Sequence, residues 1–171
     1  MMKQKIQDAF NVQLNAELFS SYLYLSMAAF FESQNLKGMA HWMRMQMAEE
    51  EIHGMKFFNF IHECGGRVTL AKIQEPKTEW GSPLEAFDDA YKHEGKVTGM
   101  INDLVDLSLR EKDHASNAFL QWFVTEQVEE EAAALEIRDK LKLIGDSPVA
   151  LFMIDQELGQ RPAPAVGQVG A

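Results

Sequence analysis

Apolar residues recur along most of the chain at the roughly 3.6-residue spacing that places them on one face of an α-helix. Residues typical of helix ends separate these repeats, such as Gly65 after one repeat and Ser82 followed by Pro83 before the next. Glu85 lies three residues after Ser82, as in a capping box. The pattern predicts five helices, over residues 5–33, 37–64, 83–111, 113–143 and 148–158.

The segment from residue 65 to residue 82 has no helical periodicity, and it connects the second and third predicted helices. Eighteen extended residues can span about 59 Å, which exceeds the length of about 42 Å of a helix of about 28 residues. The other connections between the long helices are short. Short, long and short connections predict two antiparallel helix pairs joined by one crossover. We therefore expect an all-α four-helix bundle with one long crossover loop and a short fifth C-terminal helix.

Each of the four long predicted helices carries an apolar stripe that metal-capable side chains interrupt near its middle. The interruption is Glu17 in the first helix and Glu94 in the third. The second and fourth helices each carry two such residues three positions apart, which places them on one helix face. These pairs are Glu50 with His53 and Gln127 with Glu130. Because positions at mid-height meet whichever way neighbouring helices run, all six side chains can converge on one volume.

Several carboxylates buried together would be strongly destabilising, or would take up protons, unless a cation compensates them. One or two divalent metal ions would remove that cost. Carboxylate oxygens with one imidazole suit iron, manganese or magnesium better than a tetrahedral zinc site. Two redox-active metals bridged by Glu50 and Glu130 could pass two electrons to dioxygen. Tyr24, one heptad after Glu17, could supply an electron or a hydrogen bond, or could be an ordinary core residue with a bonded hydroxyl.

The composition and charge of the chain narrow its partners and its compartment. With 171 residues the chain is long enough for one domain with a core, which we expect over residues 1–160. The net charge of -10 argues against nucleic acid or an anionic membrane as a partner and favours cations. No stretch is apolar enough for secretion or for crossing a bilayer, and the single Cys64 cannot form an internal disulfide. A cytoplasmic location follows. The last residues, 161–171, have the composition of a flexible tail.

Some charged residues near the proposed metal positions are expected to have no role there. Glu51 lies about 100° around the helix from Glu50, so we expect it on the solvated face. The remaining histidines are expected to be structural: His41, His62, His93 and His114.

The chain resembles non-haem bacterial ferritins, members of the ferritin-like di-iron carboxylate family. The resemblance covers nearly the whole chain and includes Glu94 and three longer motifs. These are NAELFSSYLYLSMAAFF with Glu17 and Tyr24, MAEEEIHGMKFF with Glu50 and His53, and FLQWFVTEQVEEE with Gln127 and Glu130. It implies iron storage, in which a ferroxidase site oxidises Fe(II) with dioxygen or peroxide. The Fe(III) is then kept as an oxide mineral inside a hollow shell of twenty-four subunits.

The resemblance also implies roles for individual side chains. One iron would be held by Glu17, Glu50 and His53, and the other by Glu50, Glu94 and Glu130. Gln127 would hydrogen-bond near bound dioxygen. Bacterial ferritins often have a third iron site toward the cavity, which here would use Glu49, Glu126, Glu129 and Glu130.

Two departures from bacterioferritins predict that the chain binds no haem. Bacterioferritins have a second Glu-x-x-His on the fourth helix, where this chain has Gln127 and Glu130. They also place a haem-binding methionine directly after the metal-binding glutamate of the second helix, where this chain has Glu51.

The fifth predicted helix favours a homo-oligomer on separate grounds. A helix of about eleven residues is marginal alone in water, and its run from Val149 to Ile154 is almost continuously apolar. Such a helix needs partners, which in ferritins are its copies around the four-fold axis.

Three other functions are weighed against iron storage. A di-iron or di-manganese oxidase of organic substrates or peroxide would have an apolar channel to the metals and form no mineral. A miniature ferritin that coats DNA would use a different His/Asp/Glu spacing between subunits. A purely structural helical oligomer would leave the convergent buried acids without a purpose.

Overall fold

The computed structural model describes residues 2–165, and these residues form five α-helices. They are α1 (Gln4–Ser33), α2 (Lys37–Glu63), α3 (Pro83–Arg110), α4 (His114–Ile144) and α5 (Pro148–Leu158). The predicted all-α bundle with a short fifth helix is confirmed, and each helix end lies within one residue of its predicted position. The predicted tail beyond residue 165 lies outside the described residues.

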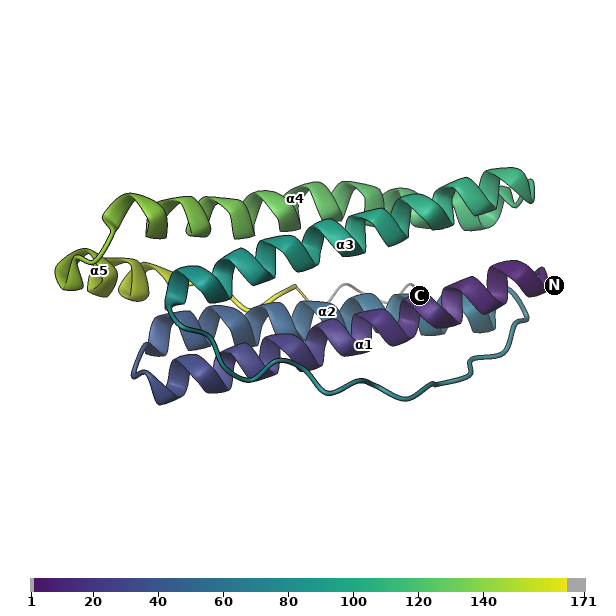
Figure 1. Ribbon diagram of the computed structural model, residues 1–171. Coiled ribbons are helices and arrows are strands. Elements are labelled where there is room, and N and C mark those ends of the chain that lie inside the picture. The colour runs from purple at the N-terminus through teal and green to yellow at the C-terminus, as the bar shows by residue number, and fades with distance from the viewer. Residues whose placement is uncertain (1, 166–171) are drawn as a thin grey trace.

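The long helices form two antiparallel pairs, α1 with α2 and α3 with α4, which lie alongside each other (Figure 1). The crossover loop, residues 64–82, leaves the far end of α2 and runs back outside α1 to the start of α3 (Figure 1). The predicted long crossover is therefore confirmed. The short α5 lies at the end of the bundle where α4 ends.

Side chains of α1 hold the crossover loop in place. The Asn11 side chain donates to the carbonyl of Arg67 at 3.0 Å and accepts from the backbone N–H of Thr69 at 2.7 Å. Farther along, the Ser26 hydroxyl donates to the carbonyl of Lys77 at 2.7 Å. These bonds satisfy peptide groups of a segment that has no helix or sheet of its own.

Local sequence explains where the helices begin and end. The Ser82 hydroxyl accepts from the backbone N–H of Glu85 at 3.1 Å, and Pro83 occupies the first turn of α3. The Glu85 carboxylate reaches back to the N–H of Gly81 at 2.7 Å, so the predicted capping box forms one residue earlier than in its usual pattern. Gly65 follows α2 with a φ of 71°, which suits glycine at a helix end.

Two apolar clusters fill the bundle, and a polar layer separates them. Phe31, Met43 and Phe87 belong to the cluster on the α5 side. Phe10 and Phe57 belong to the cluster on the side of the N-terminus. Near mid-height of each long helix, buried polar residues lie where the two clusters meet. We call this set the polar layer: Gln13, Glu17, Ser20, Gln46, Glu50, His53, Glu94, Gln127 and Glu130.

The helix α5 is docked on the first turn of α2. The buried Asp155 carboxylate accepts from the backbone N–H of Met39 at 2.9 Å and so caps α2. A Cβ atom at Gly38 would lie 1.6 Å from the carbonyl oxygen of Asp155, so this approach requires glycine. The outward side of α5 leaves three large apolar side chains exposed: Val149, Phe152 and Met153.

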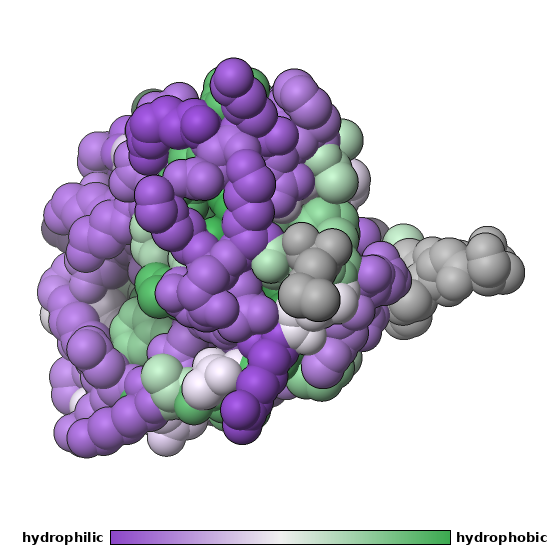
Figure 2. Space-filling view, turned by 90° about the vertical axis from the view of Figure 1, so that its right-hand side faces the viewer, coloured by the Kyte–Doolittle hydropathy of each residue, from purple (hydrophilic) through white to green (hydrophobic). Residues whose placement is uncertain are grey.

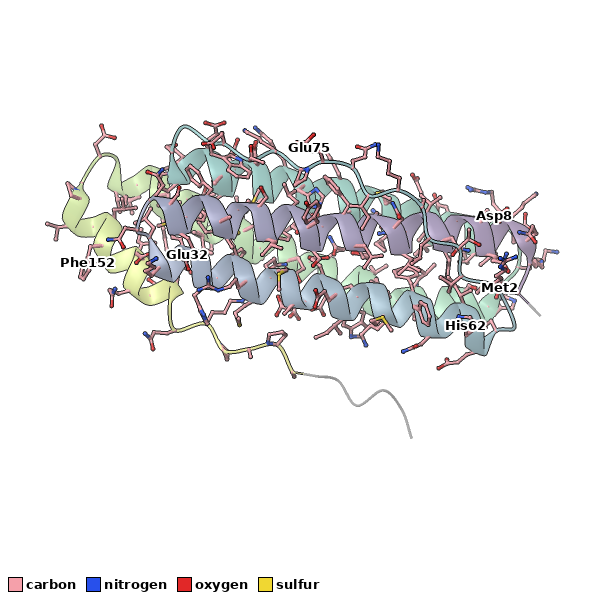
Figure 3. All side chains as sticks on the ribbon, turned by 90° about the horizontal axis from the view of Figure 1, so that it is seen from below. Met2, Asp8, Glu32, His62, Glu75 and Phe152 are labelled. Atoms are coloured by element: carbon pink, nitrogen blue, oxygen red, sulfur yellow. The ribbon has the colours of Figure 1, made fainter. Side chains whose placement is uncertain are left out.

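The two ends of the bundle have different surfaces. Figure 3 shows Phe152 at the α5 end and Met2, Asp8 and His62 at the other. The end that carries the N-terminus is largely hydrophilic (Figure 2). Both Lys3 and Lys5 pair with Glu111 there. Among the helices of residues 2–165, none combines the length and the apolarity needed to cross a bilayer.

Candidate metal centre

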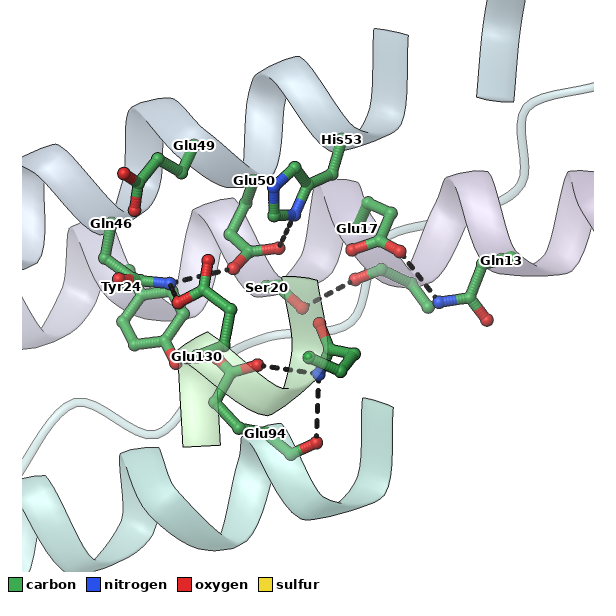
Figure 4. Close-up of polar contacts among 12 residues, drawn as sticks. Gln13, Glu17, Ser20, Tyr24, Gln46, Glu49, Glu50, His53, Glu94 and Glu130 are labelled. Atoms are coloured by element: carbon green, nitrogen blue, oxygen red, sulfur yellow. Dashed lines mark hydrogen bonds and ion pairs between the residues drawn. The ribbon is translucent and has the colours of Figure 1, made fainter. Parts of the chain in front are cut away.

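Six side chains from four helices meet at mid-height of the bundle (Figure 4). Glu17 comes from α1, Glu50 and His53 from α2, Glu94 from α3, and Gln127 and Glu130 from α4. All six are at most 6% exposed, so each interruption of an apolar stripe faces the interior.

The first candidate metal group joins α1 to α2. Ligand atoms of Glu17, Glu50 and His53 all lie within 4.8 Å of one another. His53 Nδ1 is 3.5 Å from Glu50 Oε2. One oxygen of Glu17 accepts from the Gln13 amide at 2.8 Å, whereas its Oε2 is buried with no hydrogen-bond partner among the described residues. A cation bound among these three side chains would satisfy that oxygen.

A second group joins α2 to α4. The Gln46 amide nitrogen donates to Glu50 Oε1 at 3.2 Å and to Glu130 Oε2 at 2.6 Å. Ligand atoms of His53, Glu126 and Glu130 also lie within 4.8 Å of one another. Because His53 belongs to both groups, the two candidate metal positions are neighbours.

The Glu94 carboxylate faces neutral donors. The Tyr24 hydroxyl donates to its Oε1, and the Gln127 amide nitrogen lies 3.3 Å from its Oε2. The same nitrogen is 3.3 Å from Thr98 Oγ1. Glu94 belongs to neither metal group found among residues 2–165, because its carboxylate is turned toward Tyr24 and Gln127.

Burial raises the pKa of the carboxyl groups in the polar layer. It is the largest cause of the shifts at Glu17 and Glu50, and neighbouring carboxylates add to it. Burial also raises the pKa of Glu94, and burial with the charge of Glu94 raises the pKa of Glu130 to about 8. The pKa of the Tyr24 hydroxyl is raised by burial and then by Glu94. A bound divalent cation would favour the charged carboxylates and so oppose these shifts.

The acids predicted for a third metal site have different surroundings. Glu126 is half-buried and belongs to the second group. Glu49 is also half-buried, and its carboxylate pairs with Arg161. Burial raises the pKa of Glu49, while the charge of Arg161 opposes the shift. Glu129 is exposed on α4 and belongs to neither group found in the described part of the chain.

Sequence reasoning did not assign a role in the site to Gln13, Gln46 or Arg161. Gln13 precedes Glu17 by four residues, and Gln46 precedes Glu50 by four. That spacing puts each glutamine on the same helix face as its glutamate, so the repeated pattern is a usable signal. Arg161 lies in the segment predicted to be flexible, where no periodicity indicates a contact.

Glu51 and His93, which are expected to have no role at the metals, belong to neither metal group found among residues 2–165. Glu51 is exposed, although both of its neighbours in the acidic run are at least half-buried. His93 Nε2 is 2.7 Å from the Ser20 hydroxyl oxygen. Burial lowers the pKa of His93 to about 4, which keeps this imidazole neutral.

Comparison with known proteins identifies the family. A family model described as Ferritin, ferritin-like domain, matches residues 7–144. The chain is 45% identical over 161 residues to a bacterial non-heme ferritin of Bacteroides fragilis, a match that covers 94% of this chain and 100% of the relative. It is 38% identical over 159 residues to a probable bacterial non-heme ferritin-like protein of Haemophilus influenzae, covering 93% of this chain and 96% of that protein.

Solved structures of an archaeal ferritin have the same fold. An open-pore ferritin from the hyperthermophilic archaeon Archaeoglobus fulgidus aligns with a TM-score of 0.94 and 52% identity, covering 95% of this chain and 99% of that one. A closed form of the ferritin from the same organism, engineered by site-directed mutagenesis, aligns with a TM-score of 0.95 and 51% identity, covering 96% and 100%. The family match, the identities over nearly the full length and the shared fold show that this chain belongs to the ferritin-like domain family.

Proposed function

We propose that this protein stores iron by oxidising Fe(II) at a di-iron ferroxidase site within each chain and depositing Fe(III) as an oxide mineral in a hollow shell. The main support is the set of four carboxylates buried at mid-height of the bundle: Glu17, Glu50, Glu94 and Glu130. Within residues 2–165, no lysine or arginine side chain lies at ion-pair distance from them, and His53 is their one basic neighbour at that distance. Such a set favours the binding of a cation, which would replace the protons that the buried carboxyl groups otherwise take up. The similarity to bacterial non-heme ferritins supports iron as that cation.

The two Fe(II) ions would share Glu50. Glu17, Glu50 and His53 would bind one of them, which the first metal group supports. Glu50, Glu94 and Glu130 would bind the other, with the Tyr24 hydroxyl still bonded to one oxygen of Glu94. Hard oxygen ligands stabilise Fe(III) over Fe(II), so this ligand set favours oxidation.

The remaining polar residues would orient the ligands and the oxidant. Each Fe(II) gives one electron, so the pair reduces one dioxygen molecule to hydrogen peroxide with two protons from water. Gln127, beside Glu94, would donate a hydrogen bond to dioxygen, while Gln46 and Tyr24 would hold the carboxylates. Glu126 adjoins His53 and would receive Fe(III) leaving the pair, together with Glu49 and Glu129 as a third site. Hydrolysis of Fe(III) releases protons as the mineral grows.

The assembly would be a homo-oligomer of twenty-four chains in the cytoplasm, without haem. The exposed apolar side of α5, with Val149, Phe152 and Met153, supports contact between copies. The exposed Glu51, where bacterioferritins have a haem-binding methionine, supports the absence of haem. The net charge of -10 favours cations over nucleic acid and anionic membranes.

The variant Glu50→Ala tests the site, because Glu50 belongs to both proposed ligand sets. We expect the initial rate of Fe(III) formation under air to fall about a hundredfold, followed by absorbance and oxygen uptake. The mass of the assembly, measured by light scattering, should not change. Glu51→Ala is the matched control, since its side chain is exposed one residue away, and it should oxidise Fe(II) at the parent rate. Rapid oxidation by Glu50→Ala would show that the site is assigned wrongly.

A size measurement combined with ferrous loading separates storage from the alternatives. A shell near twenty-four subunits that accumulates many irons per chain fits storage. A small oligomer that binds two irons per chain and forms no mineral fits an oxidase of organic substrates.

A further inference from the structure

The C-terminal segment, residues 159–165, leaves α5 and runs back along α2 (Figures 1 and 3). Arg161 anchors it. The guanidinium carbon lies 4.4 Å from the centroid of the Trp42 indole. The guanidinium donates to Gln46 Oε1 at 2.9 Å and to the carbonyl of Trp42 at 3.4 Å, and it pairs with the Glu49 carboxylate. The backbone carbonyl of Arg161 lies 2.8 Å from His41 Nε2.

The same segment borders a cavity beside the candidate metal centre. The cavity has a volume of about 270 Å³, and Glu49, His53 and Glu126 line it. Pro164 and Ala165 line it as well. The C-terminal segment therefore covers a cavity that is also lined by His53 and Glu126, two members of the second metal group.

Glu49 differs from the carboxylates of the polar layer because it already has a cation. Arg161 pairs with it, whereas Glu50 and Glu130 accept from the neutral amide of Gln46. The contact between Arg161 and Gln46 Oε1 also fixes which way that amide faces. Arg161 thus joins the C-terminal segment to both the outer acid and the inner ones.

We propose that Arg161 is a displaceable latch, whose guanidinium occupies the place at Glu49 that a divalent cation takes when it binds Glu49 and Glu126. Binding of that cation releases residues 159–165 from α2 and opens the cavity. This inference rests on the proposed function, in which the cation is Fe(II).

Competition for one carboxylate has a thermodynamic consequence. Each cation weakens the binding of the other by the same factor, so metal binding and release of the segment are reciprocally linked. The carboxylates that have no permanent cation therefore bind Fe(II) first. Glu49 binds it afterwards, when Arg161 has left.

The test is an anaerobic Fe(II) titration of the assembled full-length protein by calorimetry, comparing the parent with Arg161→Gln. We expect Fe(II) beyond two equivalents per chain to bind about tenfold more tightly in the variant, as for the loss of a competing ion pair. The first two equivalents should bind within about threefold of the parent. A segment that is merely anchored, without competing for Glu49, predicts no change in the later equivalents.

Arg138→Gln is the matched control. Arg138 also lies over an aromatic ring, 4.5 Å from Tyr91, and pairs with Asp88 and Asp139. It should titrate like the parent, because its partners lie outside the centre.

The double variant Glu49→Gln/Arg161→Gln removes the carboxylate for which the two cations compete. The gain seen in Arg161→Gln should disappear in it. A gain that persists without Glu49, or later equivalents that bind no more tightly in Arg161→Gln, would overturn the latch. Weak binding of the first two equivalents by the parent would instead overturn the proposed function.

Hydrogen–deuterium exchange tests the latch by a measurement that does not depend on binding affinity. In the metal-free protein, the amides of the non-proline residues of 159–165 should exchange faster in Arg161→Gln than in the parent. Adding Fe(II) anaerobically beyond two equivalents per chain should speed exchange in the parent. Protection of the segment that is unchanged in both experiments would also overturn the latch.

Discussion

Glu85 at the surface start of α3 and Glu130 in the middle of α4 carry the same carboxyl group in opposite settings. Glu85 has a permanent cation, Lys77 Nζ at 2.8 Å, and this contact lowers its pKa. Glu130 is 6% exposed and accepts from the neutral amide of Gln46. Burial, with the charge of Glu94 next, raises the pKa of Glu130 to about 8.

The difference shows that Glu130 has a neutral hydrogen-bond donor where Glu85 has a permanent cation. An amide or a hydroxyl orients a buried carboxylate without neutralising it. A lysine or arginine in that layer would neutralise the carboxylates, but it would also occupy the place that the proposed function gives to iron. The metal-free bundle therefore keeps its buried acids partly protonated, and metal binding exchanges those protons for a cation.

The largest expected effect concerns the pH dependence of stability. The folded-state pKa of Glu130 is about 8, against an ordinary value of 4.5. Because folding raises this pKa, binding of a proton by Glu130 stabilises the folded state. This stabilisation is fully present below the ordinary pKa and is lost as the pH rises through about 8. In the metal-free protein above that pH, Glu130→Gln should be more stable than the parent by a few kcal/mol, measured by urea denaturation. The two proteins should converge in acid.

Glu85→Gln is the control for this comparison. The pKa of Glu85 is lowered, so its contribution is lost only as the pH falls, and the variant should keep the parent's fall in stability toward alkaline pH. Anaerobic Fe(II) should remove that fall in the parent. A parent whose metal-free stability does not fall as the pH rises through about 8 contradicts the contrast between the two carboxyl groups.

A smaller effect is expected from Tyr24→Phe. This change removes a buried hydroxyl that donates to Glu94. The metal-free protein should lose about 1–2 kcal/mol of stability in a urea titration, because a buried acceptor loses its donor. Tyr22→Phe is the control, since Tyr22 is 48% exposed on the same helix, and it should match the parent. Equal losses in both variants would mean that the hydroxyl of Tyr24 does not hold Glu94.

The smallest effect is expected at the surface. Lys92 pairs with Asp88 at 2.6 Å, but the two side chains are 63% and 30% exposed. Lys92→Ala should shift the thermal unfolding midpoint by less than about 2 °C in calorimetry. A shift as large as that of Tyr24→Phe would show that surface pairs contribute as much as contacts in the polar layer.

The helices could be predicted closely because their boundaries depend on local chemistry. Ser82 and Pro83 begin α3, and Gly65 follows the end of α2, in positions that require only neighbouring residues. The crossover between the two helix pairs could be predicted from the length of the loop. Its attachment to α1 through Asn11 and Ser26 did not, since these side chains meet carbonyls more than fifty residues away.

In the candidate site, too, some features could be predicted from local sequence and others depend on tertiary contacts. Helical periodicity alone places Glu17 and Glu94 inside the bundle. The direction in which the Glu94 carboxylate points depends on Tyr24, which is 70 residues away, and so on tertiary packing. Arg161 meets Gln46 across 115 residues, in a segment whose composition predicts a flexible tail. No local pattern encodes that contact.

The cap that Asp155 places on α2 also determines what any neighbouring surface encounters at this end. A helix as short as α5 would be only partly formed if it hung free, yet it is immobilised against Gly38 as part of folding. When another surface covers Phe152, the entropy cost of binding is limited to rigid-body motion and a few side-chain rotamers. The entropy cost of forming the helix has already been met during folding. The apolar side of α5 is thus an ordered helix surface before any contact forms, and not a flexible segment.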